Sequence, residues 1–453
     1  MVFNPRFIKK EEIEKLLTEV TQEEFYNARA KSLTPLKDTI LFKGDGPYVT
    51  DVNDNKYLDM TAQAWTLNSG YLNEDIMYSV YTQMHYLTHV RYGYPTIPRI
   101  KLINTLTELF GFEKVAFNNE GGGLAIEAAM KLAMVNRPGK KVFIMSYRGY
   151  HGSTLATIPA GNPLPAAIRF DGFGTEHFKR IPYPYCYRCP FNKQFGECEF
   201  ECLSSLENLL TYDNNNDIAA LIIEPMQGPG GQIPSPTGYL ERLKQIVHEN
   251  DLLLVFDESQ TTFGRIGRWS ASEYYNVKPD IMTTTKALGG GFPLGAILAT
   301  KELSGFTEGE EHTTFGSDPV LFAAALASIE VTRRMKLLEN SEKIGGYILK
   351  RLNEMKESHK LIGDVRGVGL FIGIELVKDK KTKVPATEET ELIIHYAYDK
   401  KVIFDFSMPQ ITKNEFSFRN VLKMKPPLTI TEEEAGHALD VFEESLTKVE
   451  REE

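Results

Sequence analysis

The sequence carries the run DIMTTTKALGGG at residues 280–291. Lys286 follows an apolar, threonine-rich segment typical of a strand, and three glycines come directly after it. Lysine normally prefers water, and glycine lets the backbone turn tightly or approach another group. A lysine at a strand end beside glycines suits a Schiff base with an aldehyde cofactor. The alternative is an ordinary surface lysine before a loop, and the neighbouring segments are needed to distinguish the two interpretations.

Strands and helices alternate between residues 112 and 300. The apolar runs predict strands at 115–117, 141–145, 219–223, 252–256 and 281–284, and the amphipathic spacing predicts helices at 124–136 and 238–249. Apolar strands separated by helices indicate an α/β fold with a mostly parallel sheet covered on both faces. Such sheets carry their sites at the carboxyl ends of the strands.

Two of these strand ends offer groups for a phosphate and a flat ring. Gly121, Gly122 and Gly123 follow the first strand and precede a helix, where free N–H groups and the helix dipole attract an anion. The glycines have neither P-loop nor dinucleotide-binding spacing, and a flexible turn is the alternative. Tyr150 and His151 follow the second strand, where an aromatic side chain can stack on a ring or serve only in packing.

Two further strand ends carry carboxylates. Glu224 closes the apolar strand at 219–223, and Asp257 closes the strand at 252–256. An unpaired carboxylate at a buried strand end is costly, so Asp257 needs a cationic partner. A protonated pyridine nitrogen is the partner typical of pyridoxal 5′-phosphate sites. The phosphate cradle, the aromatic residue, this acid and Lys286 together predict pyridoxal 5′-phosphate as the cofactor.

With these residues in hand, the chain resembles the class III aminotransferases of fold type I over roughly residues 35–445. The motifs that carry the resemblance are Tyr150-His151-Gly152, Glu224-Pro225-x-Gln227-Gly228, Asp257-Glu258-x-Gln260, Phe263-Gly264-Arg265-x-Gly267, Lys286-Ala287-Leu288-Gly289-Gly290-Gly291, Thr314-Phe315-Gly316 and Pro426-Pro427-Leu428. The resemblance implies a large domain with a mostly parallel seven-stranded sheet, and a smaller α+β domain built from the N- and C-terminal segments. The domain boundaries that we expect are 1–75, 76–330 and 331–453.

The resemblance also implies a function and a role for each site residue. The enzyme moves an amino group from an amine or amino acid to a keto acid through an internal aldimine on Lys286. Asp257 pairs with the pyridine nitrogen, Tyr150 or His151 packs on the ring, and Gln260 lies near its phenolic oxygen. Thr314 reaches the phosphate in the other subunit, because sites of this family are built across a homodimer or a dimer of dimers.

The sequence departs from the family pattern at two places. The glycine loop is one residue longer than usual and brings Glu120 close to the expected phosphate, so the N–H groups that hold the phosphate stay open. Lys423 stands where an arginine is common, and lysine cannot grip a carboxylate with a planar fork. Trp65, Glu224 and Lys423 are the candidate substrate contacts, and aromatic residues at 65, 92 and 94 favour an apolar amine.

Three alternatives share this scaffold. An amino-acid racemase or epimerase would return the proton to the substrate carbon, and an amine phospho-lyase would eliminate phosphate. The Arg148-Gly149-Tyr150 and Gly367-Val368-Gly369 segments resemble the racemase branch, whereas the segment before Pro426 resembles the phospho-lyase branch. A non-catalytic binding protein is the alternative from another class, and it would not need both Lys286 and Asp257.

The composition argues against some classes of binding partner. The 453 residues carry a formal charge of −10 without a long basic run, which argues against nucleic acid and anionic membranes. The N-terminus has no apolar core of signal-peptide length, so we expect a cytoplasmic protein. The four cysteines follow the pattern Cys186-x2-Cys189-x8-Cys198-x3-Cys202, which suits either a metal or reduced thiols. The gap between the pairs is shorter than in common zinc patterns, and we assign no metal to the site from the sequence.

Overall fold

The computed structural model describes residues 7–118, 121–161, 170, 172, 174–213, 217–411 and 417–452. Asn119 and Glu120 of the glycine loop lie outside the described residues, so the structure does not address the expected effect of Glu120 on a phosphate. No helix in the described part of the chain is long and apolar enough to cross a membrane.

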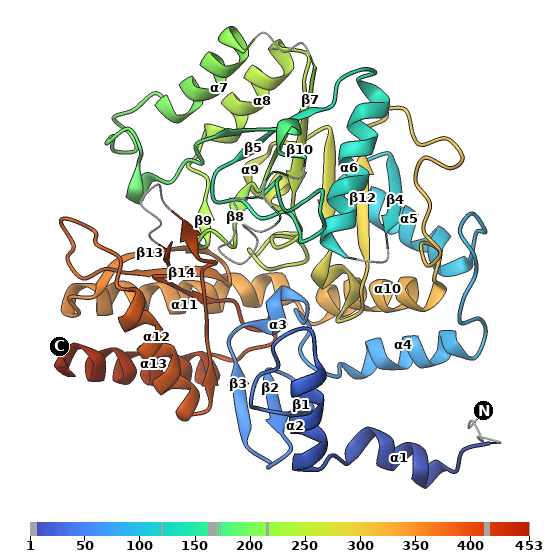
Figure 1. Ribbon diagram of the computed structural model, residues 1–453, viewed down its shortest axis with the longest axis vertical. Coiled ribbons are helices and arrows are strands. Elements are labelled where there is room, and N and C mark those ends of the chain that lie inside the picture. Colours follow the sequence, from blue (N-terminus) through green and yellow to red (C-terminus); the bar gives the residue numbers. More distant parts are fainter. Residues whose placement is uncertain are drawn as a thin grey trace.

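A seven-stranded sheet forms the upper part of the molecule (Figure 1). Its strands, in spatial order, are β4 (Lys114–Asn118), β12 (Gly295–Ala299), β11 (Ile281–Thr284), β10 (Leu253–Asp257), β7 (Ile218–Ile223), β5 (Val142–Ser146) and β6 (Phe178–Ile181). Strand β12 runs antiparallel to both neighbours, and the other pairs are parallel. The predicted mostly parallel seven-stranded sheet is confirmed, with β6 and β12 added to the five strands expected.

Both faces of the large sheet are buried. Leu253 and Val255 of β10 pack in the core that contains α6 (Gly122–Asn136), whereas Leu254 and Phe256 pack in the core that contains α8 (Tyr239–Glu249). Successive side chains of a strand point to opposite faces, so a strand covered on both sides has to be apolar throughout. This explains the uninterrupted apolar runs in the sequence.

The N- and C-terminal segments meet in the lower part of Figure 1. One small sheet has the order β1 (Leu41–Asp45), β2 (Tyr48–Asp51), β3 (Lys56–Asp59) and β15 (Val402–Ile403), and another has the order β13 (Ile362–Val368), β14 (Phe371–Leu376), β19 (Val421–Met424) and β16 (Asp405–Phe406). Strand β15 pairs in parallel with β3, with Val402 opposite Leu58. This pairing joins the two ends of the chain, as the fold class predicts. The boundaries at residues 75 and 330 stay predictions.

The remaining described elements are mostly helices at the periphery and short two-residue strands. They are α1 (Lys10–Thr18), α2 (Gln22–Lys31), α3 (Ala62–Trp65), α4 (Glu74–Met84), α5 (Ile97–Phe110), α7 (Glu201–Tyr212), α9 (Ala271–Tyr275), α10 (Pro319–Arg334), α11 (Leu337–Ser358), α12 (Thr387–Asp399), α13 (Glu432–Glu452), β8 (Met226–Gln227), β9 (Ile233–Pro234), β17 (Gln410–Ile411) and β18 (Ser417–Phe418). Three 3-10 turns complete the set: η2 (Thr175–His177), η3 (Cys186–Arg188) and η4 (Lys286–Gly289).

The N-terminal residues form two separate helices, α1 and α2. Thr21 accepts a hydrogen bond from the Glu24 N–H, and Glu24 in turn accepts one from the Thr21 N–H. This reciprocal capping box starts α2 as a new helix directly after α1. Neither helix has a buried residue.

Element α3 is a left-handed turn. Its φ angles are 46° at Ala62, 42° at Gln63, 62° at Ala64 and 68° at Trp65. Left-handed backbone costs L-residues roughly 1–2 kcal/mol each, so the surroundings have to hold it. Asp59 does so by accepting hydrogen bonds from the N–H groups of Thr61 at 2.8 Å and of Gln63 at 3.2 Å. The turn places Trp65 beside Lys286.

Candidate active site

A cavity of about 300 Å³ opens at the carboxyl ends of the parallel strands. It is lined by residues from five chain segments: Gly122, Gly123, Leu124, Tyr150, His151, Gly152, Ser153, Thr154, Glu224, Asp257, Ser259, Gln260 and Lys286. The structure therefore brings most of the predicted cofactor-binding residues together. Because each segment follows a different strand, the sheet itself places them at one edge.

Asp257 is the central acid of this cavity. Its Oδ2 lies 2.9 Å from Nδ1 of His151, and its Oδ1 accepts hydrogen bonds from the N–H and hydroxyl of Ser259. Burial alone would raise the pKa of Asp257, but the bond and charge of His151, the Ser259 hydroxyl and the charge of Lys286 lower it. Asp257 is therefore an ionised carboxylate held in place, able to balance a positive charge above it.

Lys286 begins the η4 turn directly after β11. Its φ is 48°, and its Nζ lies 5.3 Å from the centre of the Trp65 ring. Burial lowers the pKa of Lys286, the charges of Asp257 and Glu224 oppose this effect, and the charge of Lys423 adds to it. A lowered pKa increases the fraction of neutral amine, which is the form that attacks a carbonyl carbon or accepts a proton.

The glycine loop meets the Tyr150–His151 segment at the floor of the cavity. A Cβ on Gly152, whose φ is 135°, would lie 2.5 Å from the Cα of Gly123, so a side chain there is excluded. Gly122 and Gly123 line the cavity at the N-terminus of α6, where N–H groups and the helix dipole favour an anion. Gly121 precedes the helix with a φ of 102° and does not line the cavity.

Glu224 joins two loops rather than facing only the cavity. Its Oε1 accepts a hydrogen bond from the Tyr150 N–H at 3.1 Å, and its Oε2 accepts one from the Gly228 N–H at 2.9 Å. Burial raises its pKa to about 7, partly offset by the charge of His151. The structure thus gives Glu224 a positioning contact that sequence reasoning, which treated it as a substrate contact, did not find.

A second cavity of about 770 Å³ adjoins the first and shares Tyr150, Gln260 and Lys286 with it. The residues found only in this second cavity are Ala64, Trp65, Pro229, Thr387, Glu391, Asp405, Phe406, Ser407, Met408, Pro409, Arg419 and Lys423. Two predicted substrate contacts, Trp65 and Lys423, are among them. The volume is ample for an amino acid or a small amine.

Lys423 does not face this cavity as an isolated cation. Its Nζ lies 3.2 Å from Oδ2 of Asp405, which also lies 2.7 Å from the Nζ of Lys425. The Lys425 Nζ lies 3.4 Å from the centre of the Trp65 ring. Sequence reasoning missed Asp405 and Lys425. Two lysines at alternate positions of an otherwise apolar strand end could have indicated this charged cluster, because alternate residues of a strand share one face.

Three residues considered from the sequence lie elsewhere. Thr314 is exposed and lines neither cavity. The ring of Tyr92 packs against His312 at 5.0 Å, and Tyr94 is exposed; neither residue lines the two cavities. The expectation that residues 92 and 94 help to shape an apolar amine pocket stays a prediction. Both follow α4 on a loop far in sequence from the strand ends.

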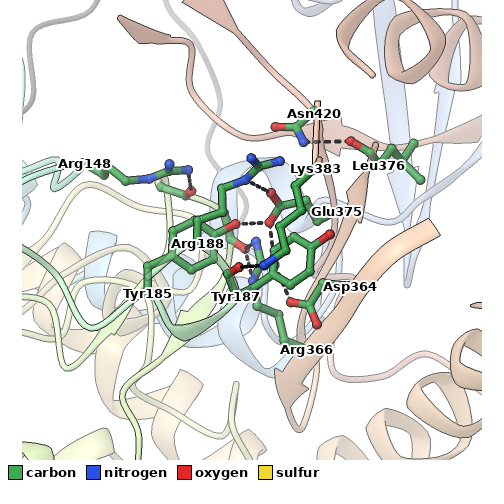
Figure 2. A network of polar contacts seen from close by, with 12 residues as sticks. Arg148, Tyr185, Tyr187, Arg188, Asp364, Arg366, Glu375, Leu376, Lys383 and Asn420 are labelled. Carbon is green, nitrogen blue, oxygen red and sulfur yellow. Dashed lines mark hydrogen bonds and ion pairs between the residues drawn. The ribbon is translucent and has the colours of Figure 1, made fainter. Parts of the chain in front are cut away.

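A network of charged and aromatic residues surrounds Glu375 (Figure 2). Glu375 accepts hydrogen bonds from the Tyr185 hydroxyl, from Nε of Arg188 and, at 2.8 Å, from Nη1 of Arg366. Arg148, two residues before Tyr150, donates to the Gly230 carbonyl at 2.8 Å, and its guanidinium lies 4.7 Å from the Tyr185 ring centre. The network connects the C-terminal sheet to the loop that carries Tyr150.

Residues 29–446 match the family described as aminotransferase class III. The chain belongs to the class III aminotransferases. Leucine/methionine racemase of Thermococcus litoralis is 36% identical over 91% of this chain and 91% of its own. Acetylornithine aminotransferase of Methanosarcina acetivorans is 35% identical over 90% of this chain and 91% of its own. The structure of an amine transaminase from an uncultivated Pseudomonas species, solved in its PLP-bound form, has a TM-score of 0.83, shares 28% identity, and covers 91% of this chain and 95% of that chain.

The family confirms the prediction of a pyridoxal-phosphate-dependent aminotransferase of fold type I. The cavity at the strand ends fits that cofactor on independent grounds. Within the described part of the chain, Nε2 of His151 and Oε1 of Gln260 are buried without a hydrogen-bond partner, and so is Oγ1 of Thr285 beside Lys286. Each such atom costs roughly 1–3 kcal/mol when left unsatisfied. A bound polar molecule at this place would satisfy them.

Proposed function

We propose that this chain transfers an amino group from an amino acid to a keto acid, and that Lys286 and Asp257 carry the chemistry. The observation that supports this proposal most is the lysine–acid pair: both groups line one cavity at the strand ends, beside the glycine turn of α6. Pyridoxal 5′-phosphate, when bound, supplies an aldehyde and a ring that withdraws electrons from a neighbouring carbon. The remaining work falls to residues of this chain.

Each residue has a task that follows from its surroundings. Lys286 Nζ, with its lowered pKa, would take the proton from the substrate carbon that bears the amino group and deliver it to the cofactor carbon that receives that group. Asp257, kept ionised by His151, would balance the positive charge of the ring nitrogen. The N–H groups of Gly122 and Gly123 at the start of α6 would hold the phosphate.

The other cavity residues position the ring. Tyr150 lines both cavities, so we assign it the face of the ring that the substrate approaches. His151 lies against Asp257 instead, which supports Tyr150 rather than His151 as the residue that would pack on the ring. The unpaired Oε1 of Gln260 lies in both cavities, and its amide suits the phenolic oxygen of the ring.

The larger cavity supports an amino-acid substrate with an apolar side chain. Besides Lys286, its wall carries two cations, Lys423 and Arg419, and two carboxylates, Asp405 and Glu391. Lys423 and Arg419 are the groups that a substrate carboxylate would meet there. The rings of Trp65 and Phe406 offer apolar surface for its side chain.

The test compares an amino acid with the amine that lacks its carboxylate. Replacing Lys423 by Met should raise KM for the amino acid several-fold and leave KM for the amine unchanged, because only the carboxylate loses a partner. Lys350→Met, on the surface helix α11, is the control with the same change of charge. Equal effects on both substrates would remove the assigned role of Lys423 in carboxylate binding.

A racemase is the second candidate, because leucine/methionine racemase shares 36% identity over 91% of each chain. Racemisation returns the proton to the substrate carbon from the opposite face, and it needs no keto acid. Incubation of one enantiomer of leucine with PLP-loaded protein, with and without a keto acid, separates the two activities. We expect amino transfer only when a keto acid is present, and the appearance of the other enantiomer without it would favour the racemase.

We further propose a homodimer in which Thr314 reaches the partner's phosphate. Thr314 is exposed, and its neighbour Phe315 packs against His89 at 5.4 Å. Besides Phe315 (53%), large side chains of α4, α5 and the loop between these helices are exposed: Tyr78 (72%), Tyr86 (81%), Leu87 (42%), Tyr94 (58%), Ile97 (71%) and Ile100 (50%). An exposed apolar surface of this kind marks a protein interface.

Light scattering of the purified chain tests the assembly, and we expect a mass of two chains or a multiple of two. Thr314→Ala should weaken cofactor binding without changing that mass, whereas a fully active monomer would contradict the proposal. The cytoplasmic location expected from the sequence also stays a proposal, and cell fractionation tests it.

A further inference from the structure

The four cysteines form a cluster that the proposed reaction does not use. Cys186 and Cys189 belong to or follow the η3 turn, Cys198 lies in the loop, and Cys202 lies in the first turn of α7. The loop between η3 and α7 contains only turns and bends. All four thiols are free, and all four line one small cavity.

The size of this cavity limits what it could hold. Its volume is about 20 Å³, and a single water molecule needs roughly 10–15 Å³ of such space. An organic ligand is therefore too large, whereas one ion fits. The rest of the wall is mostly apolar and includes Phe191, Phe195 and Phe200, so the thiols are the main donor groups that such an ion would meet.

We infer that Cys186, Cys189, Cys198 and Cys202 bind one zinc ion through their four sulfur atoms. Zinc in structural sites takes four ligands in a tetrahedron, commonly all cysteine, supplied as two close pairs. Here the pairs are Cys-x2-Cys and Cys-x3-Cys, and the chain folds them onto one cavity. The eight residues between the two pairs are fewer than in common zinc patterns. They form a loop that needs no regular structure to bring the pairs together.

The surroundings suit the charge of such a site. Four thiolates and one dication carry a net charge of −2. Lys193 lines the same cavity, and Cys202 lies in the first turn of the twelve-residue helix α7, where the helix dipole favours negative charge.

The thiols would have to turn inward to bind the ion. Within the described residues, no three His, Cys, Asp or Glu side chains stand in the geometry of a finished metal site. Rotation of side chains in a loop is compatible with metal binding that completes local folding. Zinc displaces the thiol protons as it binds, so affinity should fall as the pH is lowered.

The ion would stabilise a segment that the cofactor site uses indirectly. Tyr185 and Arg188, at either side of Cys186, both contact Glu375 (Figure 2), and Arg148 lies over the Tyr185 ring. Arg148 in turn precedes the loop with Tyr150. Loss of zinc should therefore loosen residues 185–202 first and lower aminotransferase activity only modestly.

Metal analysis of the PLP-loaded full-length chain tests the inference. After purification without chelators and dialysis against metal-free buffer, we expect close to one zinc per chain by inductively coupled plasma mass spectrometry. Cys186→Ser with Cys198→Ser, one change in each pair, should abolish this zinc. Ser205→Ala on α7 should retain it, and retained cofactor absorbance in all variants would show that the large fold is intact.

Cobalt and thiol counting give a second readout that does not depend on a folded variant. Wild-type protein stripped of zinc should take up Co²⁺ with the intense visible bands of a tetrahedral thiolate site. Titration with a mercurial should release zinc in step with modification of four thiols. Four freely reactive thiols without cobalt uptake, a pair of disulfides, iron with labile sulfide in place of zinc, or zinc kept by the double variant would each overturn the assignment.

Discussion

His151 and Asp257 lie 2.9 Å apart, Nδ1 to Oδ2, and their residues are only 2% and 5% exposed. The two residues are 106 positions apart in the sequence and follow two different strands of one sheet. The contact makes His151 the residue that keeps Asp257 ionised in a buried place. The other ring nitrogen of His151, Nε2, is buried and has no hydrogen-bond partner among the residues that the structure describes.

Replacing His151 by Phe should make Asp257 easier to protonate. Because His151 lowers the pKa of Asp257, its loss raises that pKa, and the acid side of the pH profile of kcat/KM should move to higher pH. The control is His248→Phe, which removes an exposed histidine 3.0 Å from Asp280. An unchanged acid side in the His151 variant would show that Asp257 does not depend on this contact.

Glu224 should destabilise the folded protein at neutral and alkaline pH. Its native pKa of about 7 exceeds the ordinary 4.5, so the folded state binds more protons than the unfolded state between these values. The free energy of unfolding therefore falls as the pH rises through this window, by up to about 3 kcal/mol. Glu224→Gln should remove this loss. The free energy of unfolding of the variant minus that of wild type should therefore increase from pH 5 to pH 8. Thermal unfolding at both pH values measures it, and a constant difference would contradict the assignment.

Glu375 should contribute strongly to stability through the network in Figure 2. Its side chain is 1% exposed and contacts both Arg188 and Arg366. Glu375→Gln leaves buried cations without their partner, and breaking a buried ion pair costs roughly 3–5 kcal/mol. Glu330→Gln breaks an exposed pair with Arg334 and should cost less than about 1 kcal/mol. Urea unfolding compares them, and equal losses would mean that the network adds nothing beyond a surface pair.

Ala64 should tolerate, and even favour, glycine. Its φ is 62° in the left-handed turn that carries Trp65, and glycine adopts this conformation without strain. Ala64→Gly should therefore raise the free energy of unfolding by roughly 1 kcal/mol. Ala327→Gly, inside the right-handed helix α10, should lower it by about the same amount. The opposite signs are the diagnostic result, and destabilisation by both changes would contradict the left-handed assignment.

Much of the sheet and the cofactor cavity could be predicted, because both depend on local patterns. Apolar runs predict buried strands, and groups at the ends of parallel strands meet at one edge, so the meeting of Asp257 and Lys286 follows from the sequence. Strand β12 was missed because it runs antiparallel and follows the glycines directly. No helical segment precedes its short apolar run, so the run does not fit the alternation of strands and helices from which the other strands were predicted.

The second cavity could not be predicted, because it depends on contacts between distant segments. Asp405 meets Lys423 only because β16 pairs with β19, and Trp65 meets Lys286 only because four residues adopt a left-handed turn. No residue type in that turn favours left-handed backbone. The link from Glu375 to the loop after β5 likewise joins residues more than 200 positions apart, and no local pattern signals it.

Chemical mapping of the cofactor-bearing lysine tests the account most directly. Reduction of PLP-loaded wild-type protein with borohydride fixes the imine, and peptide mass spectrometry then locates the pyridoxyl group. Lys423 and Lys425 lie 4.9 and 3.4 Å from the centre of the same Trp65 ring that Lys286 approaches, so they are internal controls. We predict one adduct, on Lys286, and none after Lys286→Ala. An adduct on Lys423 or Lys425, or no adduct in the wild-type protein, would contradict the account.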